Sequence, residues 1–334
     1  MAASIRIIAE ACGVSIATVS RALAGHPTVR PETRERVVAA ARRLGYARNN
    51  LVGTVMSQLR ASRAMNFKGS LALIHVPSPG QPHLLPTQQR IIEGARARAV
   101  ELGFKLDVFT LSAEGFNLRR LVQVLRARNV SGLILIYSDP SNATADFPWD
   151  DFTAVEIDYG EREPRITTVC IDHYQTFMGA LSRLHALGYR RMGLFLERFK
   201  DDRLWFRFSA AYHSFHLYET SAKQLPPYVT ERMQAGGFLA WYRKHKPDLV
   251  VGHVDEAVGW LRSIGVRVPE ATAYFNLNWT ARRRPCAGLD YVPELQGSVA
   301  ADSVIGQVLR HERGRPANPL NTMIRGRWVD GPTL

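Results

Sequence analysis

The chain has few cysteines and no long apolar run, and both shortages exclude classes of protein. Its 334 residues include only three cysteines, which form no CxxC pair and no Cys/His spacing, so neither a disulfide framework nor a zinc site is expected. No stretch of about 18 apolar residues is present, and the first fifteen residues lack the pattern of a secretory signal. We expect a cytoplasmic protein with no metal and no membrane contact.

The glycine motifs of common nucleotide and hydrolase sites are also missing. The sequence contains no GxGxxG, GxxxxGK[ST] or GxSxG, which are the devices for dinucleotides, nucleotide phosphates and an esterase nucleophile. A sugar-acting enzyme would need a convergent carboxylate pair or a nucleophile with its base, and neither can be identified. The sequence therefore predicts a protein that is not an enzyme and uses no cofactor.

Positive charge is abundant and unevenly distributed. The formal net charge is +13. Residues 1–63 carry ten Arg and three Glu, a net of +7, and the other 271 residues share +6. A basic segment of this density favours a polyanionic partner such as double-stranded DNA, although a solvated basic face without a specific partner would look the same in composition.

The N-terminal residues show the pattern of three short helices. A first helix over 5–12 ends at Gly13, and after a three-residue turn Ser15 is placed to cap a second helix over 16–23. A third helix over 31–44 starts with a proline and is followed by glycine. Two helices joined by so short a turn form a helix-turn-helix, so residues 1–46 are expected to be a DNA-binding headpiece.

The second of these helices has the side chains that reading DNA requires. Apolar residues near its start can contact thymine methyl groups, a basic residue one turn later can reach guanine, and hydroxyl groups can hold phosphates. The candidates are Ile16, Ala17 and Arg21 for bases and Ser15, Thr18 and Ser20 for phosphates. An amphipathic helix of this composition can equally serve only for packing.

About forty consecutive positions resemble a known family. The run IAEACGVSIATVSRALAGHPTVRPETRERVVAAARRLGY closely resembles the headpiece of the LacI/GalR family of bacterial repressors. The resemblance implies base reading by Ile16, Ala17 and Arg21, with Ser15, Thr18, Ser20 and Asn49 facing the DNA backbone. Ile7, Cys12, Ala24 and Arg30 depart from the family pattern, but none of these departures removes a reading residue.

Residues 47–68 resemble the hinge that follows this headpiece in the family. That hinge becomes helical on DNA and wedges an apolar side chain into the minor groove. Gly53 stands where the family has Arg, at a cost of about 1 kcal/mol relative to alanine in a helix. Val55 replaces the wedge leucine, with Met56 as its possible substitute. A plain linker is the alternative.

From residue 69 onward, apolar strand patterns alternate with helical ones, and the alternation repeats after residue 165. This order predicts an α/β fold with parallel sheets and helices on their faces, in two lobes with a ligand cleft at the strand carboxyl ends. The layout resembles the periplasmic-binding-protein-like sensor core of the same family. We expect an N-subdomain of 69–160 plus about 291–319, and a C-subdomain of 161–290 plus about 320–334.

The resemblance also implies an effector site in that cleft, lined by Asp172, His173, Arg207, His253 and Asn276. His253-Val254 and Asn276-Leu277 replace polar residues that contact sugars in the family. The ligand is then an unusual sugar, an aromatic or acidic metabolite, or absent.

Each of these residues, and their surroundings, also has an ordinary structural explanation. Asp172 can be a helix N-cap, and Arg207 a surface or structural cation. The aromatic stretch 203–218 is better explained by core packing than by ring stacking on a ligand. His213 and His216 have the spacing of a metal pair but no third ligand nearby in sequence.

The leading hypothesis is a homodimeric transcription regulator that binds a pseudo-palindromic operator. A repressor is favoured over an activator. The regulator is expected to respond to a small molecule, and a carbohydrate is the first candidate. Dimerisation follows from the family and from the small surface that one headpiece would bury. A free-standing solute-binding protein and a sugar-acting enzyme are the alternatives, and the headpiece argues against both.

Overall fold

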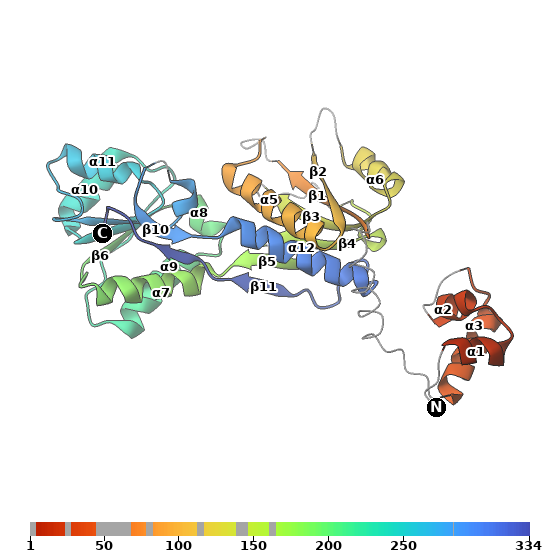
Figure 1. Cartoon of the computed structure of the whole chain (residues 1–334). Helices are drawn as coiled ribbons and strands as arrows, with labels where there is room; N and C mark the ends of the chain where they lie inside the picture. Colours follow the sequence, from red (N-terminus) through yellow and green to blue (C-terminus); the bar gives the residue numbers. More distant parts are fainter. Residues whose placement is uncertain are drawn as a thin grey trace. The chain divides into compact units, whose positions relative to one another are not determined.

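The computed structural model consists of two compact units, Met1–Asn66 and Phe67–Leu334 (Figure 1). It describes residues 5–23, 28–44, 68–77, 83–111, 117–137, 146–159, 165–282 and 284–334. None of the helices in these ranges has both the length and the apolar character needed to cross a membrane.

The small unit is a three-helix headpiece, which confirms the predicted helix-turn-helix. Its helices are α1 (Ile5–Cys12), α2 (Ile16–Leu23) and α3 (Pro31–Arg43). Ile8, Val19 and Val37, one from each helix, are fully buried against one another. Gly13 has a φ of +61°, a conformation that glycine adopts without strain, and this allows the tight turn between α1 and α2.

The large unit contains two six-stranded sheets. The first has the order β11-β5-β4-β3-β1-β2 and is parallel throughout; the second has the order β12-β10-β9-β8-β6-β7 and is parallel except for β12 against β10. The strands of the first sheet are β1 (Gly69–Val76), β2 (Phe104–Thr110), β3 (Val130–Tyr137), β4 (Thr153–Ile157), β5 (Thr167–Ile171) and β11 (Asn321–Ile324). Those of the second are β6 (Met192–Glu197), β7 (Tyr228–Thr230), β8 (Leu249–Gly252), β9 (Ala273–Asn276), β10 (Ala287–Asp290) and β12 (Arg327–Val329).

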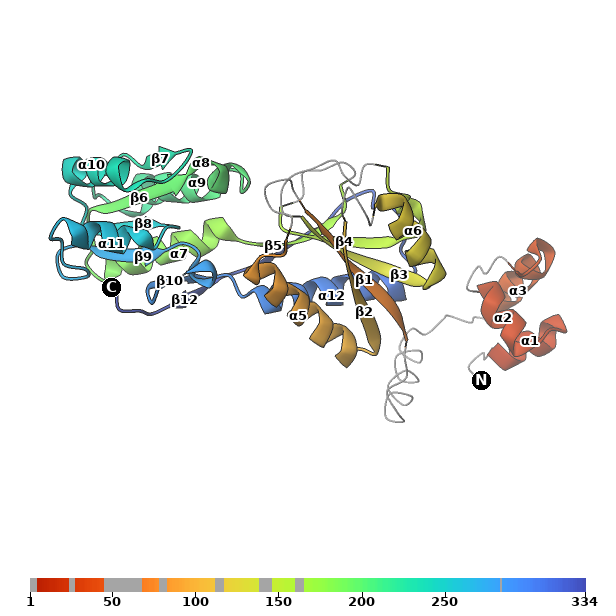
Figure 2. The ribbon, with the colours of Figure 1, turned by 90° about the horizontal axis from the view of Figure 1, so that it is seen from above.

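Helices cover both faces of the first sheet, forming the N-lobe (Figure 2). Leu71 and Leu73 of β1 pack into the cluster that includes α5 (Pro86–Glu101) and α12 (Pro293–Leu309). Their neighbours Ala72 and Ile74 pack with α6 (Leu118–Ala127) on the other face. This alternation follows from the two-residue period of a strand, and burial on both faces explains why β1 reads as a continuous apolar run.

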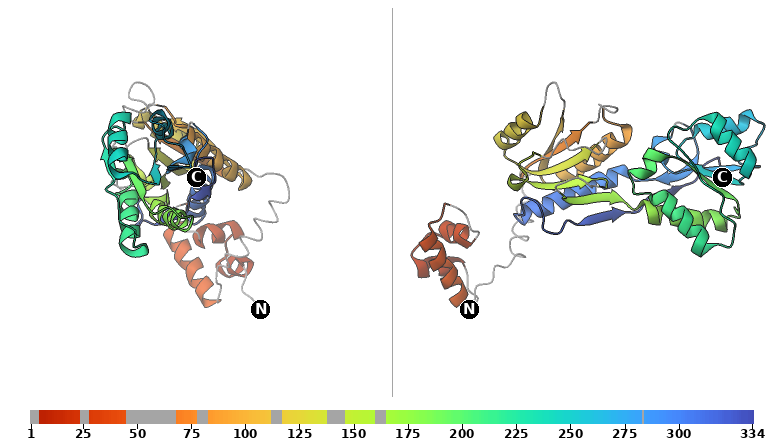
Figure 3. Two further views of the ribbon diagram at one scale, coloured as in Figure 1. Left: turned by 90° about the vertical axis from the view of Figure 1, so that its left-hand side faces the viewer. Right: turned by 180° about the vertical axis from the view of Figure 1, so that it is seen from behind.

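The second sheet is covered in the same way and forms the C-lobe (Figure 3). Leu194 and Leu196 of β6 belong to the cluster that contains α7 (His173–Ala186) and α9 (Arg207–Ser214), whereas Phe195 packs with α10 (Ala235–His245) and α11 (Glu256–Ser263). Short helical segments complete the described chain: η1 (Trp149–Asp151), α8 (Arg198–Asp202), η2 (Phe215–Glu219) and η3 (Trp279–Ala281).

The strands divide between the lobes differently from the sequence-based boundaries. β5 and β11 lie in the first sheet, although residues 161–290 and 320–334 were assigned to the C-subdomain. The reason is backbone pairing: Val155 of β4 pairs with Thr167 of β5, and β11 extends the sheet from β5. The chain consequently passes between the sheets at 172, 291–292 and 325–326.

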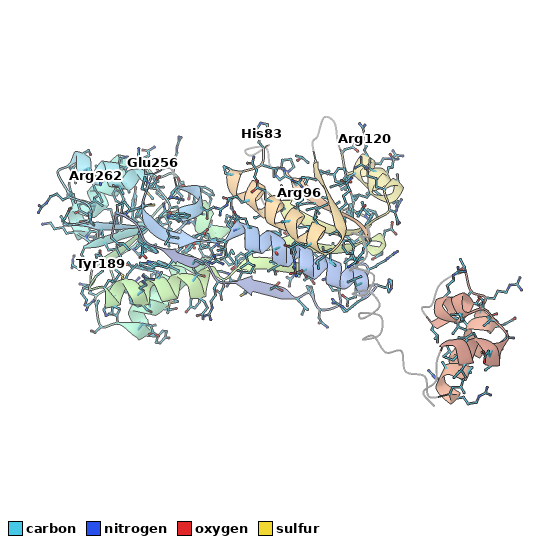
Figure 4. All side chains as sticks on the ribbon, viewed as in Figure 1. His83, Arg96, Arg120, Tyr189, Glu256 and Arg262 are labelled. Carbon is cyan, nitrogen blue, oxygen red and sulfur yellow. The ribbon has the colours of Figure 1, made fainter. Side chains whose placement is uncertain are left out.

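Three exposed arginines of the large unit lie on three different helices. Arg96 on α5, Arg120 on α6 and Arg262 on α11 are all exposed and project from different helices (Figure 4). The high density of positive charge in residues 1–63 remains an observation from the sequence.

Candidate functional site

Helix α2 is capped and has one buried and one exposed side. The Thr18 amide donates to Ser15 Oγ at 3.1 Å, so Ser15 caps the helix as the sequence predicted. Val19 and Ala22 are buried, whereas the apolar side chain of Ile16 is 48% exposed and Arg21 is also exposed. The headpiece core thus fixes the orientation of α2 while leaving Ile16 and Arg21 accessible to a partner.

The other predicted DNA-contacting residues are only partly described. Thr18 is half-buried, and its hydroxyl lies 2.8 Å from Ser15 Oγ. Ala17 and Ser20 lie within α2. Asn49, Val55 and Met56 fall outside the described residues, so their assignment to the hinge stays a prediction.

A second candidate site, which we call the inter-lobe cluster, lies where strands of the two lobes end. Its residues follow β4, β5, β8 and β10 or belong to the segment after β6, at the carboxyl ends of the strands, where open α/β sheets bind ligands. They are Asp158, Tyr159, His173, Arg203, Arg207, Phe208, His253 and Tyr291.

The His173 ring is the centre of this cluster. Its centroid lies 4.7 Å from that of Tyr291, 5.4 Å from Phe208 and 5.7 Å from Tyr159. Phe208 in turn meets the ring of His253 edge-on at 5.1 Å. The aromatic rings of both lobes thus form one continuous set of contacts.

Two arginines of the C-lobe contact the end of β4 in the N-lobe. Arg203 forms an ion pair with Asp158, and the Arg207 guanidinium lies over the Tyr159 ring. Arg207 begins α9 directly after Trp205 and Phe206, whose φ values of +57° and +54° are uncommon for residues other than glycine. The structure holds a strained backbone at the point that positions Arg207, as functional sites often do.

The carboxylate of Asp201 secures this turn. It is buried and accepts hydrogen bonds from the amides of Phe208 at 3.0 Å and Ser209 at 3.3 Å, and from the Ser209 hydroxyl. Burial raises the pKa of Asp201 above its usual value in spite of these bonds. Asp201 is therefore a positioning residue for the start of α9.

Burial sets the protonation states in the cluster. It lowers the pKa of His173 to about 4, with Arg203 and Arg207 acting in the same direction against Asp158. Burial also lowers the pKa of His253 well below its usual value. Burial alone would raise the pKa of Asp158, but Arg203 and His173 outweigh it and the net pKa is lowered. At neutral pH both histidines are uncharged and Asp158 is ionised.

The structure brings together three of the five residues predicted to bind the effector. His173, Arg207 and His253 all belong to the inter-lobe cluster. Asp172 is the N-cap of α7, accepting from the Gln175 amide at 3.0 Å, which fits the structural alternative. Asn276 is fully buried, and its Oδ1 accepts from the Asn278 amide at 2.7 Å, so its side-chain oxygen is used within the fold. Their roles in ligand binding stay predictions.

Sequence reasoning missed five residues of the cluster, which are Asp158, Tyr159, Arg203, Phe208 and Tyr291. Asp158 and Tyr159 directly follow β4, a strand that was not predicted, and Tyr291 follows β10 in the same way. One signal could have found them. Ligand-binding side chains follow parallel strands, so the residues after every expected strand are candidates, in addition to those that the family resemblance implies.

The aromatic side chains of residues 203–218 divide into a buried and an exposed set. Phe208, Tyr212 and Phe215 are buried, as the packing interpretation predicted, whereas Trp205, Phe206 and Tyr218 are at least half exposed. The paired histidines face other partners: His213 Nδ1 lies 2.5 Å from Gln224 Nε2, and His216 Nδ1 lies 2.8 Å from the Tyr212 carbonyl oxygen. Within the described ranges, no three His, Cys, Asp or Glu residues are grouped to hold a metal.

Comparison with known proteins finds similarity to bacterial transcription regulators. Residues 4–49 match the family model described as bacterial regulatory proteins, lacI family. An uncharacterised HTH-type transcriptional regulator, YkvZ of Bacillus subtilis, is 29% identical over 211 residues, which is 62% of this chain and 60% of that protein. Further curated relatives are matched over about half of their length.

Solved structures match along the whole chain. The transcriptional regulator CelR in complex with cellobiose has a TM-score of 0.58 at 20% identity, covering 99% of this chain and 100% of that one. The lac repressor dimer bound to operator and the anti-inducer ONPF has a TM-score of 0.57 at 20% identity, covering 100% and 99%. At this identity the likeness establishes the fold, an N-terminal helix-turn-helix followed by a two-lobed periplasmic-binding-protein-like core. Residues 4–49 thus match the lacI family of bacterial regulatory proteins, and the fold of the whole chain matches that of solved transcription regulators.

Proposed function

We propose that this protein is a sequence-specific DNA-binding transcription regulator, most simply a repressor, whose operator affinity changes when a small molecule binds between the lobes of its core. The observation that carries the proposal is the exposed side of α2. A capped helix presents Ile16 and Arg21 to solvent while Val19 anchors it in the headpiece core. An apolar and a basic side chain, both exposed on the same short helix, suit a major groove, where thymine methyl groups and guanine acceptors lie side by side.

Electrostatics supports DNA as the partner of the headpiece. Residues 1–63 carry a net charge of +7, and each phosphate contact by an arginine releases counterions and strengthens binding at low salt. Specific binding further requires two half-sites, because one three-helix unit buries little surface. We therefore propose a homodimer on a pseudo-palindromic operator, as in the operator-bound dimer of the lac repressor.

The core supports regulation by a ligand rather than catalysis. The inter-lobe cluster joins the ends of strands from both lobes, so a molecule bound there would change the free energy of their relative arrangement. A solved relative binds cellobiose, which makes a carbohydrate-like metabolite the starting candidate for this chain. The family consists of regulators and not of enzymes, in line with the absence of catalytic motifs. The proposed place of action is the cytoplasm, where the chromosome lies.

Selection of DNA fragments by the purified full-length chain tests the proposal. Random duplexes are bound at about 150 mM salt, recovered through several rounds and sequenced. A regulator is expected to enrich one pseudo-palindromic site and to bind it at least about 10³-fold more tightly than scrambled duplex. Equal affinity for all duplexes, governed only by salt, would refute sequence-specific regulation.

A further inference from the structure

The inter-lobe cluster contains buried hydrogen-bonding groups that have no partner in the described structure, and these groups define the ligand more closely. We propose that the effector is an organic oxyanion, a carboxylate carried on a flat or ring-shaped body, rather than a neutral polyol. The proposal rests on the function proposed above, since it specifies the ligand of the same core. It concerns how the ligand's charge is recognised and does not depend on which DNA site is bound.

Three polar atoms of the cluster are buried without a hydrogen-bond partner in the described structure. They are Arg207 Nε, the Tyr291 hydroxyl and His253 Nδ1. Arginine Nε–H is only a donor, and a phenol donates readily. Tyr291 is 9% exposed, so water is largely excluded from it. Buried groups of this kind cost about 1–3 kcal/mol each when they stay unpaired, and a ligand that accepts hydrogen bonds removes that cost.

The nearby carboxylates, in contrast, are already occupied. Asp158 pairs with Arg203, and Asp201 accepts from Phe208 and Ser209. Asp290 Oδ1 accepts from the Thr280 hydroxyl at 2.9 Å and the Val292 amide at 3.1 Å. A sugar hydroxyl both donates and accepts, so a polyol site needs free acceptors beside its donors. Of the free groups at this site, Arg207 is charged and can only donate, whereas the Tyr291 hydroxyl and the neutral His253 ring can either donate or accept.

One cation at the site, Arg207, has no ion-pair partner within the described ranges. Arg203 is balanced by Asp158, and Lys200 by Glu197 at 2.9 Å. Both histidines are neutral at physiological pH because burial lowers their pKa values. Arg207 has no carboxylate partner among the residues that the structure describes. A ligand carboxylate would supply the missing partner of Arg207, and the planar guanidinium matches a carboxylate in geometry.

The rest of the site is made of ring faces and edges. Tyr159, His173, Phe208 and Tyr291 pack around the same point, and such surfaces favour a flat apolar body. A carboxylate held by Arg207 would have Tyr159 of the other lobe beside it, since the guanidinium already lies on that ring. Anion binding is in this way coupled to the contact between the lobes.

Matched acid and neutral probes test the charge requirement. The full-length chain is melted at constant ionic strength with up to about 50 mM benzoate or benzamide, which differ in charge but hardly in shape, and with the ring-shaped pair glucuronate and glucose. We expect saturable stabilisation by at least one carboxylate and an affinity for its neutral partner at least about tenfold weaker. Arg207→Gln should weaken the acid at least about tenfold, and Arg207→Lys, which keeps the charge but loses the fork, should be intermediate.

Arg198→Gln is the control, because Arg198 is a half-exposed arginine of the same segment that pairs with Asp202. This variant should respond to the acids as the unmodified chain does. Stronger binding of glucose or benzamide, an acid response unchanged in Arg207→Gln, or no saturable response to either acid would overturn the proposal. Because the melts contain no DNA, a chain that selects an operator but prefers neutral probes would refute only the ligand class. Conversely, Arg207-dependent acid binding without operator selection would refute only the regulator.

Discussion

The Arg207 guanidinium of the C-lobe lies over the Tyr159 ring of the N-lobe, with 4.4 Å between the guanidinium carbon and the ring centroid. Cation–π contacts contribute about 0.5–2 kcal/mol, depending on exposure. This pair connects the start of α9 with the end of β4, two places that the sequence separates by almost fifty residues. In the proposed ligand site, this contact couples binding of the ligand's negative charge by Arg207 to the arrangement of the two lobes.

Removing the Tyr159 ring should lower the free energy of unfolding more than removing only its hydroxyl group. We expect Tyr159→Ala to lower the free energy of unfolding by about 2 kcal/mol, from lost burial and the lost cation–π contact. Tyr159→Phe keeps the ring and loses the hydrogen bond to the Ile171 carbonyl and the 3.4 Å contact between the hydroxyl and His173 Nδ1, a loss of about 1 kcal/mol. Urea denaturation followed by tryptophan fluorescence measures both. Equal losses in the two variants would show that the ring itself contributes nothing.

Helices α5 and α12 cross at two glycines, and the crossing should not tolerate a methyl group. A Cβ on Gly297 would lie 1.9 Å from the Ile91 carbonyl oxygen, and one on Gly94 would lie 2.0 Å from the Glu294 carbonyl oxygen. Gly297→Ala is therefore expected to destabilise the large unit by about 2–3 kcal/mol, because two backbones must move apart.

A helix glycine in open space provides the matched control for this change. A Cβ on Gly179 of α7 would have no neighbouring atom within 4 Å, so Gly179→Ala should stabilise by about 0.5–1 kcal/mol through helix propensity. Thermal or urea melts of the two variants should shift in opposite directions. A neutral Gly297→Ala would mean that the two helices pack less closely than the structure shows.

Acidification should destabilise the large unit through His173. The folded-state pKa is about 4, below the unfolded value near 6.5, so the unfolded chain binds a proton first. Stability is present above about pH 6.5 and is lost as the pH falls towards 4. Between pH 7.5 and 5 the expected loss from this residue is about 2 kcal/mol.

Tryptophan fluorescence suits this measurement, because all six tryptophans lie in the large unit. Replacement of His173 by phenylalanine should flatten the pH dependence by the same amount, since the side chain no longer titrates. His253, whose pKa burial also lowers, contributes in the same direction and remains in the variant. A pH profile unchanged by the substitution would argue against a neutral buried His173.

Arg21 should determine selectivity for DNA sequence. Arg21→Ala is expected to reduce the preference for the selected operator over scrambled duplex by about 10- to 100-fold, because an arginine contact to a guanine contributes about 1–3 kcal/mol of discrimination. Competition experiments read by fluorescence anisotropy give this ratio directly.

An exposed arginine on α3 provides the comparison. Arg42→Ala removes one positive charge from the same headpiece, so it should weaken all duplexes alike and reduce the salt dependence. Unaltered tryptophan melts would show that the core is intact in both variants. If Arg21→Ala behaves like Arg42→Ala, α2 is not the helix that reads the bases.

The sequence by itself determined the local elements of this protein. Helix α2, its Ser15 cap and the turn at Gly13 follow from side-chain chemistry within a few residues, and the buried strands β1 and β3 follow from continuous apolar runs. The resemblance of the headpiece to the lacI family was also readable, since about forty adjacent positions carry it. These features depend on neighbours in the chain, for which pattern and propensity are sufficient.

Only the tertiary structure decided which distant residues meet. It placed β5 and β11 in the first sheet, brought Tyr159 and Tyr291 to His173, and used the Asp172 and Asn276 side chains for local hydrogen bonds. It also showed that Arg207 has a ring partner and no carboxylate partner within the described chain. The physical reason is that pairing between strands and packing between lobes join residues far apart in sequence, where periodicity carries no information about which surfaces face each other.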